Sequence, residues 1–261
     1  MEILEFGNKN KPKIIFIHGF QSVWQRWEKY IEYYKNDYHI IIPIVTGHNQ
    51  NKKEEFISFE ETAKELEDYI ISKYGNNIYA IFGVSMGGVL AATLWQNKKL
   101  KIEKLIFDGS PLCSFGTFMK KYLSNFYLKV THKSQARDEQ TIENAKKILI
   151  PKGKENEFLK MIDNLSDKSI VNFITEMGKF KLAKDMDVSK TQIYYYHGTK
   201  LDEILSKKTA KLIKKYYPTA KVVCMKGTAH CEWFSGKFER CVKILDEILV
   251  EPLNWHYKMS T

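Results

Sequence analysis

A serine with a glycine two positions away on each side lies where an apolar run meets a helix-forming stretch. Residues 83–88 read Gly-Val-Ser-Met-Gly-Gly, with Ser85 in the middle of the Gly-x-Ser-x-Gly pattern. The preceding residues 78–82 are typical of a buried strand, and residues 89–95 favour a helix. A strand, a sharp turn and a helix hold a hydroxyl beside the free N–H groups of a helix N-terminus. The pattern therefore predicts a nucleophilic Ser85, against the alternative of a glycine-rich turn with an unreactive serine.

The second candidate for chemistry is a histidine near the carboxyl end of the chain. A serine hydroxyl is a weak nucleophile at neutral pH and needs a base to take its proton. We expect this base to be His230, which follows the last apolar run in a Gly-Thr-Ala-His turn and comes after the serine in chain order. The alternative is a histidine held only by backbone hydrogen bonds. His18 and His48 lie in turns of architectural type, which makes them weaker candidates.

Several further segments resemble those of the α/β-hydrolase family. Residues 14–20, Ile-Ile-Phe-Ile-His-Gly-Phe, resemble the strand of that family that ends in His-Gly. Residues 38–48 are similar to its next strand and Gly-His turn, and residues 226–230 resemble the turn that presents its histidine. The resemblance implies that the backbone N–H groups of Phe20 and Met86 form an oxyanion hole. It also implies a catalytic serine and histidine in the positions found above.

The carboxylate that would orient the histidine departs from the family pattern. Members commonly carry Asp or Glu three positions after a glycine that follows the strand corresponding to residues 192–197, but here Leu201 has that position. A one-residue adjustment of the loop would bring Asp202 to the imidazole, and we predict Asp202 as the acid. Two alternatives stay open: Asp108, because some relatives take their acid from the end of that strand, and Glu203. A carboxylate that only places charge at a helix start is the remaining interpretation.

Apolar strands and amphipathic helices alternate along the chain, which predicts a mostly parallel central sheet with helices on both faces. This is the α/β-hydrolase fold that the resemblance implies. Only residues 1–6 precede the first parallel strand, so an antiparallel edge there is short. Strands are expected at 13–17, 38–45, 78–84, 102–108, 192–197 and 221–226. Helices are expected at 24–35, 59–74, 88–97, 206–216 and 237–250.

A long interval separates two strands that should be neighbours in the sheet. Residues 112–189 are far more than one crossover helix requires, so we expect them to form an inserted helical cap. Residues 1–111 and 190–261 would then form the α/β core. In the resembling family such an insertion covers the serine. Its aromatic residues are candidates for a substrate pocket, although most are expected to pack within the cap: Phe115, Phe118, Tyr122, Phe126, Tyr127, Phe158 and Phe173.

Composition excludes several classes of function. The chain of 261 residues has a net charge of +10, but only three of its 41 basic residues are arginine and no basic run is interleaved with aromatics. We therefore expect no nucleic-acid partner. The sequence contains no His-Glu-x-x-His motif, phosphate loop or dinucleotide fingerprint, and its four cysteines have no metal-site spacing. We expect neither a metal nor an organic cofactor.

The first residues and the absence of long apolar runs bear on location. Residues 1–6 are acidic rather than basic, and no segment approaches the roughly 18 apolar residues that span a bilayer. We expect a cytoplasmic protein without stable membrane insertion.

The predicted function is a serine hydrolase that acts on a small ester or thioester through an acyl-enzyme. The same residues also suit carbon–carbon bond hydrolysis or a lyase step, and the fold also suits a non-catalytic binding protein.

Overall fold

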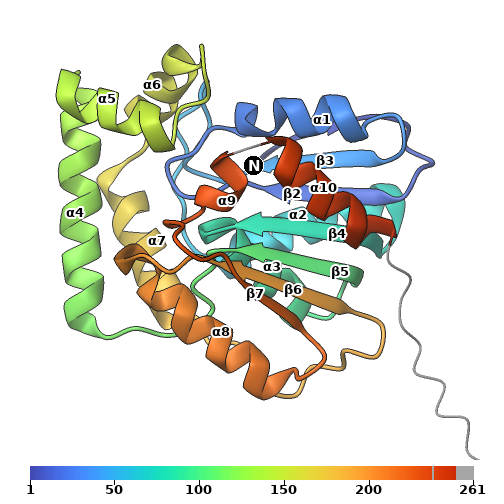
Figure 1. The fold of residues 1–261 in the computed structure, drawn as a ribbon. Coiled ribbons are helices and arrows are strands. Elements are labelled where there is room, and N and C mark those ends of the chain that lie inside the picture. Colours follow the sequence, from blue (N-terminus) through green and yellow to red (C-terminus); the bar gives the residue numbers. More distant parts are fainter. Residues whose placement is uncertain (237, 251–261) are drawn as a thin grey trace, which may run out of the picture.

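The computed structural model describes residues 1–236 and 238–250, and within them seven strands form one sheet. The order is β1-β3-β2-β4-β5-β6-β7 (Figure 1). All neighbours pair in parallel except β1, which is antiparallel to β3. The predicted parallel strands and short leading edge are confirmed. The strands are β1 (Glu2–Phe6), β2 (Lys13–Ile17), β3 (His39–Ile44), β4 (Asn77–Val84), β5 (Lys101–Asp108), β6 (Gln192–His197) and β7 (Lys221–Cys224).

Helices cover both faces of the sheet, which explains why its central strands are apolar on both sides. In β2, Ile14 and Phe16 face one buried cluster, and Ile15 and Ile17 face the other. One face packs against η1 (Trp24–Trp27), α1 (Glu28–Tyr34), α9 (Glu232–Gly236) and α10 (Phe238–Val250). The other packs against α2 (Phe59–Tyr74), α3 (Met86–Gln96) and α8 (Ile204–Tyr216). The short helix α9 was not predicted, and residue 237 of the last predicted helix lies outside the described residues.

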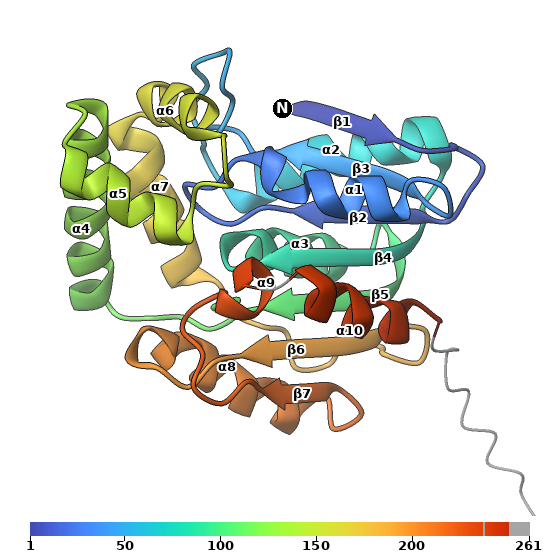
Figure 2. The same ribbon diagram turned by 45° about the horizontal axis from the view of Figure 1, so that its top comes forward.

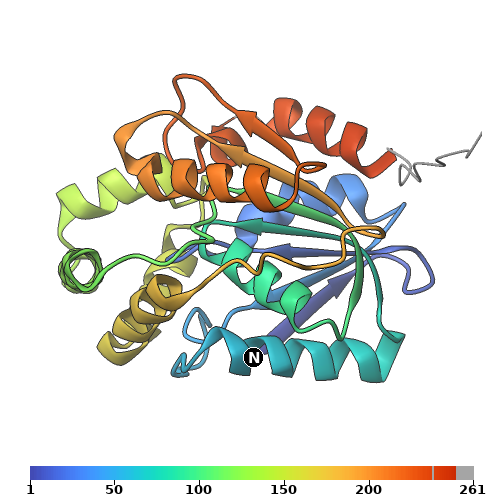
Figure 3. The same cartoon turned by 90° about the horizontal axis from the view of Figure 1, so that it is seen from below.

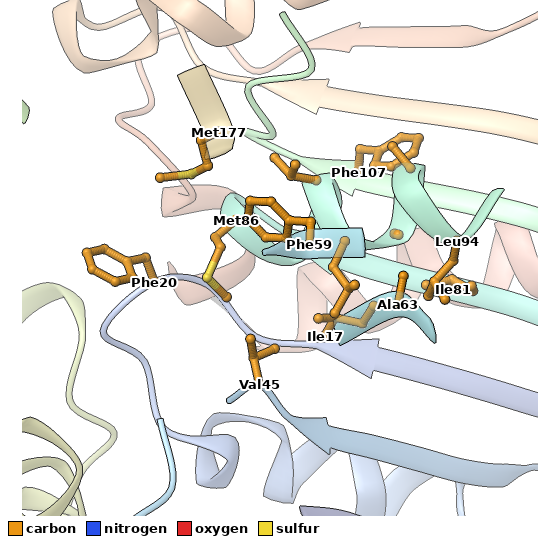
Figure 4. Packing of buried hydrophobic residues seen from close by; sticks show 14 of the residues in the cluster. Ile17, Phe20, Val45, Phe59, Ala63, Ile81, Met86, Leu94, Phe107 and Met177 are labelled. Carbon is orange, nitrogen blue, oxygen red and sulfur yellow. The ribbon is translucent and has the colours of Figure 1, made fainter. Parts of the chain in front are cut away.

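The buried cluster that contains Ile15 and Ile17 extends from the middle of the sheet to the carboxyl ends of its strands. Figure 4 shows Ile17, Ile81 and Phe107 of the strands beside helix residues. At the end of the sheet, Met86 lies between this packing and the side chains of Phe20 and Met177 (Figure 4). The apolar core therefore continues up to the loops that follow the strands.

Four helices occupy the chain between β5 and β6, as expected for the insertion. They lie beside the carboxyl ends of the strands (Figures 1 and 2). Side chains cap the N-termini of α5 and α7 in the insertion and of α2 outside it. Asp138, Ser166 and Ser58 each accept a hydrogen bond from an N–H of the first turn. The inserted helices are α4 (Thr117–Gln135), α5 (Glu139–Ile148), α6 (Glu155–Asn164) and α7 (Asp167–Lys179).

The insertion shares a hydrophobic cluster with the rest of the chain. Phe173 of α7 stacks on Phe56, with ring centroids 3.6 Å apart, and Phe158 is buried in the same cluster. The division into 1–111 with 190–261 and 112–189 stays a prediction, and residues 237 and 251–261 lie outside the described residues. In the described part of the chain, no helix is both long and apolar enough to cross a membrane.

Candidate active site

Ser85 lies between β4 and α3, in a backbone conformation that residues other than glycine rarely adopt. Its φ is 50° and its ψ is −116°. A Cβ at Gly87 would lie 2.4 Å from the carbonyl oxygen of Ile17, and a Cβ at Gly83 would lie 2.5 Å from the Cα of Gly88. Both distances are below any van der Waals contact. Glycine at these two positions therefore allows the turn to tighten between the neighbouring strand and its own helix.

The imidazole of His230 lies between the serine and a carboxylate. His230 belongs to the loop between β7 and α9, and its Nε2 is 2.9 Å from Ser85 Oγ. Its Nδ1 is 3.0 Å from Oε1 of Glu203, which belongs to η2 (Leu201–Glu203) after β6. Because a carboxylate only accepts hydrogen bonds, Nδ1 carries the proton and Nε2 is free to accept from the serine hydroxyl. The three side chains thus form a continuous hydrogen-bonded line.

The prediction that Asp202 contacts the imidazole is wrong. Glu203, one of the two alternatives, makes the hydrogen bond to the imidazole instead. Asp202 instead accepts a hydrogen bond from the backbone N–H of His230, at 3.0 Å from Oδ2. A 3-10 turn advances by about a third of a turn per residue, so consecutive side chains point in different directions. Leu201 is 94% exposed, whereas Glu203 is fully buried. The inward position therefore falls on the residue after Asp202.

Asp108, the other alternative, lies close to the site without a hydrogen bond to the imidazole among the described residues. Its side chain is buried at the end of β5, and its backbone carbonyl accepts from the N–H of Ser85 at 2.8 Å. Burial raises the pKa of Asp108 to about 7, against an opposing effect of His230, and the nearby Glu203 raises it further. Two carboxyl groups therefore lie near the imidazole, and the hydrogen bond goes to Glu203.

Partial burial and charge oppose each other at His230. Burial lowers the pKa of the imidazole, but Cys231 and Glu203 raise it by more, so the pKa lies well above its ordinary value. Burial raises the pKa of the Cys231 thiol to about 11, so near pH 7 the charged partner is Glu203. Burial would raise the pKa of Glu203, but its hydrogen bond with His230 lowers it below the ordinary value. The pair therefore favours the imidazolium, which is the form that proton transfer from a serine produces.

The two backbone N–H groups predicted to form an oxyanion hole belong to residues next to the serine, Met86 in the chain and Phe20 in the loop after β2. Met86 is the first residue of α3, and its N–H has no acceptor within the helix. Phe20 follows Gly19, where a Cβ would lie 3.6 Å from the Cβ of Ser85, so the loop after β2 lies directly against the serine. Among the described residues no acceptor is found for the Phe20 N–H. Both residues therefore adjoin Ser85 and carry a backbone N–H with no acceptor among the described residues, and their role as an oxyanion hole stays a prediction.

Two buried histidines and a glutamine hold the loop that carries Phe20. His18 Nε2 accepts from the N–H of Val45 at 3.1 Å, and His48 Nε2 accepts from the N–H of Gln21 at 3.0 Å. Burial lowers the pKa of His18 to about 4, so it is neutral and can accept. Gln21 also donates from Nε2 to Thr131 Oγ1 of α4, at 2.6 Å. No sequence pattern indicated this buried contact with the insertion.

The described residues also bear on metal binding. Within residues 1–236 and 238–250, no group of three or more His, Cys, Asp or Glu side chains is arranged to hold a metal ion.

Comparisons with known proteins show which family and which proteins the chain resembles. Residues 12–148 match the model of a family described as having the alpha/beta hydrolase fold. A pimeloyl-[acyl-carrier protein] methyl ester esterase of Legionella pneumophila is 23% identical over 94% of this chain and 98% of its own length. A Haemophilus influenzae protein, provisionally named 2-succinyl-6-hydroxy-2,4-cyclohexadiene-1-carboxylate synthase, is 29% identical over 49% of this chain. That protein and two other curated relatives are matched over only 31–47% of their own length.

Solved structures agree on the fold. A thermophilic esterase from Thermogutta terrifontis superposes with a TM-score of 0.68 at 16% identity, covering 95% of this chain and 92% of that one. MenH from S. aureus superposes with a TM-score of 0.65 at 17% identity, covering 94% of this chain and 96% of that one. At these identities the likeness concerns the arrangement of strands and helices.

Proposed function

The chain belongs to the alpha/beta hydrolase family, and from this premise we propose that it is a serine hydrolase that cleaves a small carboxylic ester or thioester. The observation that carries the proposal is the hydrogen-bonded line from Ser85 through His230 to Glu203. In this family such a line activates the serine at the turn between strand and helix. Ser85 is the nucleophile, His230 the base, and Glu203 the acid.

The acylation half-reaction uses the groups that surround Ser85. Its Oγ attacks the carbonyl carbon while its proton moves to His230 Nε2. The carbonyl oxygen becomes an oxyanion, which the N–H groups of Phe20 and Met86 stabilise. Glu203 stabilises the imidazolium that forms at the same moment. The intermediate collapses when His230 gives its proton to the leaving alcohol or thiol, which leaves the acyl group on Ser85.

Deacylation repeats these steps with water. His230 takes a proton from a water molecule, whose oxygen attacks the acyl carbon of the ester on Ser85. The second intermediate releases the carboxylic acid and returns the proton to Ser85 Oγ. The atoms therefore balance as one ester or thioester and one water giving an acid and an alcohol or thiol.

The relatives support the ester class and a small-molecule acyl substrate. The Legionella relative, which aligns over nearly its whole length, is named for the hydrolysis of a methyl ester. Within the insertion, Tyr127 of α4 and Phe173 of α7 each pack on the ring of Phe20, with centroids 5.0 Å apart. These side chains form apolar surroundings next to the proposed oxyanion N–H, and we propose that residues 112–189 act as a cap over the serine.

A fluorophosphonate probe followed by peptide mass analysis tests the nucleophile. We expect labelling at Ser85, and loss of both labelling and ester turnover in Ser85→Ala with little change in melting temperature. Ser72→Ala, on the exposed side of α2, is the matched control and should label like the wild type. Chromogenic esters and thioesters of increasing acyl length then define the substrate. Labelling that persists in Ser85→Ala would remove Ser85 from the mechanism.

A second candidate function is a carbon–carbon bond hydrolase or a lyase on the same triad. The specific support is the name of the Haemophilus influenzae relative, a synthase. In a lyase step His230 would remove a proton from substrate carbon and no acyl group would reach Ser85. Intact mass of the protein, quenched during turnover of the best ester, separates the two: an acyl adduct on Ser85 supports the esterase. Wild-type protein that is not labelled by the fluorophosphonate would instead support a non-catalytic binding protein.

A further inference from the structure

Helix α4 carries a row of aromatic side chains that the insertion does not bury. Phe118, Tyr122 and Phe126 recur every four residues and therefore lie on one side of the helix. Their exposed fractions are 86%, 59% and 48%. We call these three residues the aromatic ridge. Large aromatic rings at this exposure leave apolar surface in water, and a contiguous row of them marks an interaction site.

The same helix is positively charged. The sequence of α4 contains four lysines and no acidic residue. Lys121 and Lys129 are exposed, and no ion pair joins either to another described residue. At 3.6 residues per turn, Lys129 lies in line with the aromatic ridge and Lys121 lies on its flank. The outward face of α4 thus combines apolar rings with uncompensated positive charge.

The opposite face of α4 is turned toward the candidate active site. Tyr127 packs on Phe20, and Thr131 accepts the hydrogen bond of Gln21. Figure 3 shows α4 nearly end-on at the margin of the molecule, on the far side of the insertion from the sheet. The aromatic ridge therefore lies on the outer face of α4, opposite the face that contacts the loop carrying Phe20.

The chemistry of this face selects one class of occupant. A second copy of the chain, docked ridge to ridge, would bring the lysines of both copies together. A folded protein partner would need a complementary surface of about 800 Å² on each side, whereas a single convex helix offers a narrow ridge. An anionic lipid surface is deformable, accepts aromatic rings at the level of its headgroups and attracts lysine. We propose that the aromatic ridge with Lys121 and Lys129 docks the protein on an anionic lipid surface.

Sedimentation with large unilamellar vesicles tests this proposal on the whole chain. We expect binding to phosphatidylcholine vesicles that contain phosphatidylglycerol, weaker binding without it, and release by salt because surface charges are screened. Replacing all three ridge residues by serine should reduce the partition coefficient at least about tenfold, because each ring loses apolar burial. The double variant Lys121→Gln/Lys129→Gln should reduce it by about fivefold per lysine.

Matched controls separate the aromatic ridge from general charge and hydrophobicity. Ile148→Ser removes another exposed apolar side chain of the insertion, and Lys211→Gln/Lys214→Gln removes the same charge from α8. Both controls should bind vesicles like the wild type. Ser85→Ala should also bind normally, since docking does not depend on the proposed catalysis. The structure places the three ridge rings on the exposed face of α4 and not in the substrate pocket for which the sequence made them candidates, so the ridge variants should keep the turnover of a short water-soluble ester.

Several results would overturn the docking proposal. Wild-type protein that fails to bind anionic vesicles at low salt would do so, as would ridge variants that bind as well as the wild type. Control variants that lose as much binding as the ridge variants would show that the location is wrong. A ridge substitution that converts a dimer into a monomer, with no vesicle binding in either form, would identify the aromatic ridge as a self-association surface instead.

Discussion

Replacing Glu203 by glutamine is the sharpest test of the proposed triad. Glu203 is fully buried and its Oε1 lies 3.0 Å from Nδ1 of His230. Glutamine has the same length and keeps a carbonyl oxygen that can accept from Nδ1. The substitution therefore removes the charge while leaving the packing and the hydrogen bond largely in place. Melting temperature should change little.

The substitution removes the negative charge that stabilises the imidazolium of His230, and the expected loss of rate follows from this charge. Two unit charges about 4 Å apart interact by about 4 kcal/mol at an effective dielectric constant of about 20. That energy corresponds to about a thousandfold in rate. The His230 side chain is 34% exposed, so solvent reduces the effect. We expect kcat/KM of Glu203→Gln to fall by about a hundred- to a thousandfold, within the range of a positioned acid–base group.

Asp202→Asn is the matched control, because it removes a charge from the neighbouring residue. Among the described residues, the side chain of Asp202 accepts the backbone N–H of His230, and asparagine can still accept it. This variant should stay within a few-fold of wild-type kcat/KM on the best ester substrate. If Asp202→Asn lost activity by orders of magnitude while Glu203→Gln stayed active, the assignment of Glu203 would be refuted.

Three further perturbations have directions set by the structure. The acid limb of the pH profile of kcat/KM should lie above the ordinary histidine pKa of about 6.5, and Glu203→Gln should move it to lower pH. Asp108→Asn should raise the melting temperature at pH 7–8 but not near pH 4, because the unfolded carboxyl ionises at about 4 and the folded one at about 7. Kinetics of the same variant should stay near wild type. Lys104→Met should lower the stability of the protein by about 1–3 kcal/mol in chemical denaturation, since the Lys104 ammonium donates to the carbonyls of Ile248 and Leu249 at the end of α10.

The sheet could be predicted from the sequence because each strand carries its own signal. Runs such as residues 14–17 and 105–107 are apolar on both sides, and only a sheet covered by helices buries such a run. The turn at Ser85 carries equally local information, because its glycines are required by contacts within a few residues or with the adjacent strand. Local patterns of this kind, together with the resemblance to the family, were sufficient to predict the fold and to identify Ser85 and His230 as the nucleophile and the base.

The acid could not be predicted because its identity depends on the rotation of a short turn. Asp202 and Glu203 are neighbours with the same chemistry, and both touch His230, one at its backbone and one at its ring. Spacing from Gly198 favoured the earlier residue. Only the direction of each side chain in the 3-10 turn separates them, and in the folded chain Glu203 is the one that points into the interior. No periodic pattern in a three-residue element carries this information.

The position of the Phe20 N–H depends on contacts that span more than a hundred residues. The ring of Phe20 lies against Tyr127 and Phe173, and the next residue, Gln21, donates to Thr131. A backbone donor stabilises an oxyanion only when it is held at hydrogen-bonding distance before the charge develops. Besides His48, which accepts from the N–H of Gln21, α4 and α7 supply side chains that hold this loop. The insertion therefore helps to position one of the two proposed oxyanion donors. Substrate preference and catalytic rate are therefore expected to change together when residues on the inner face of α4 are replaced.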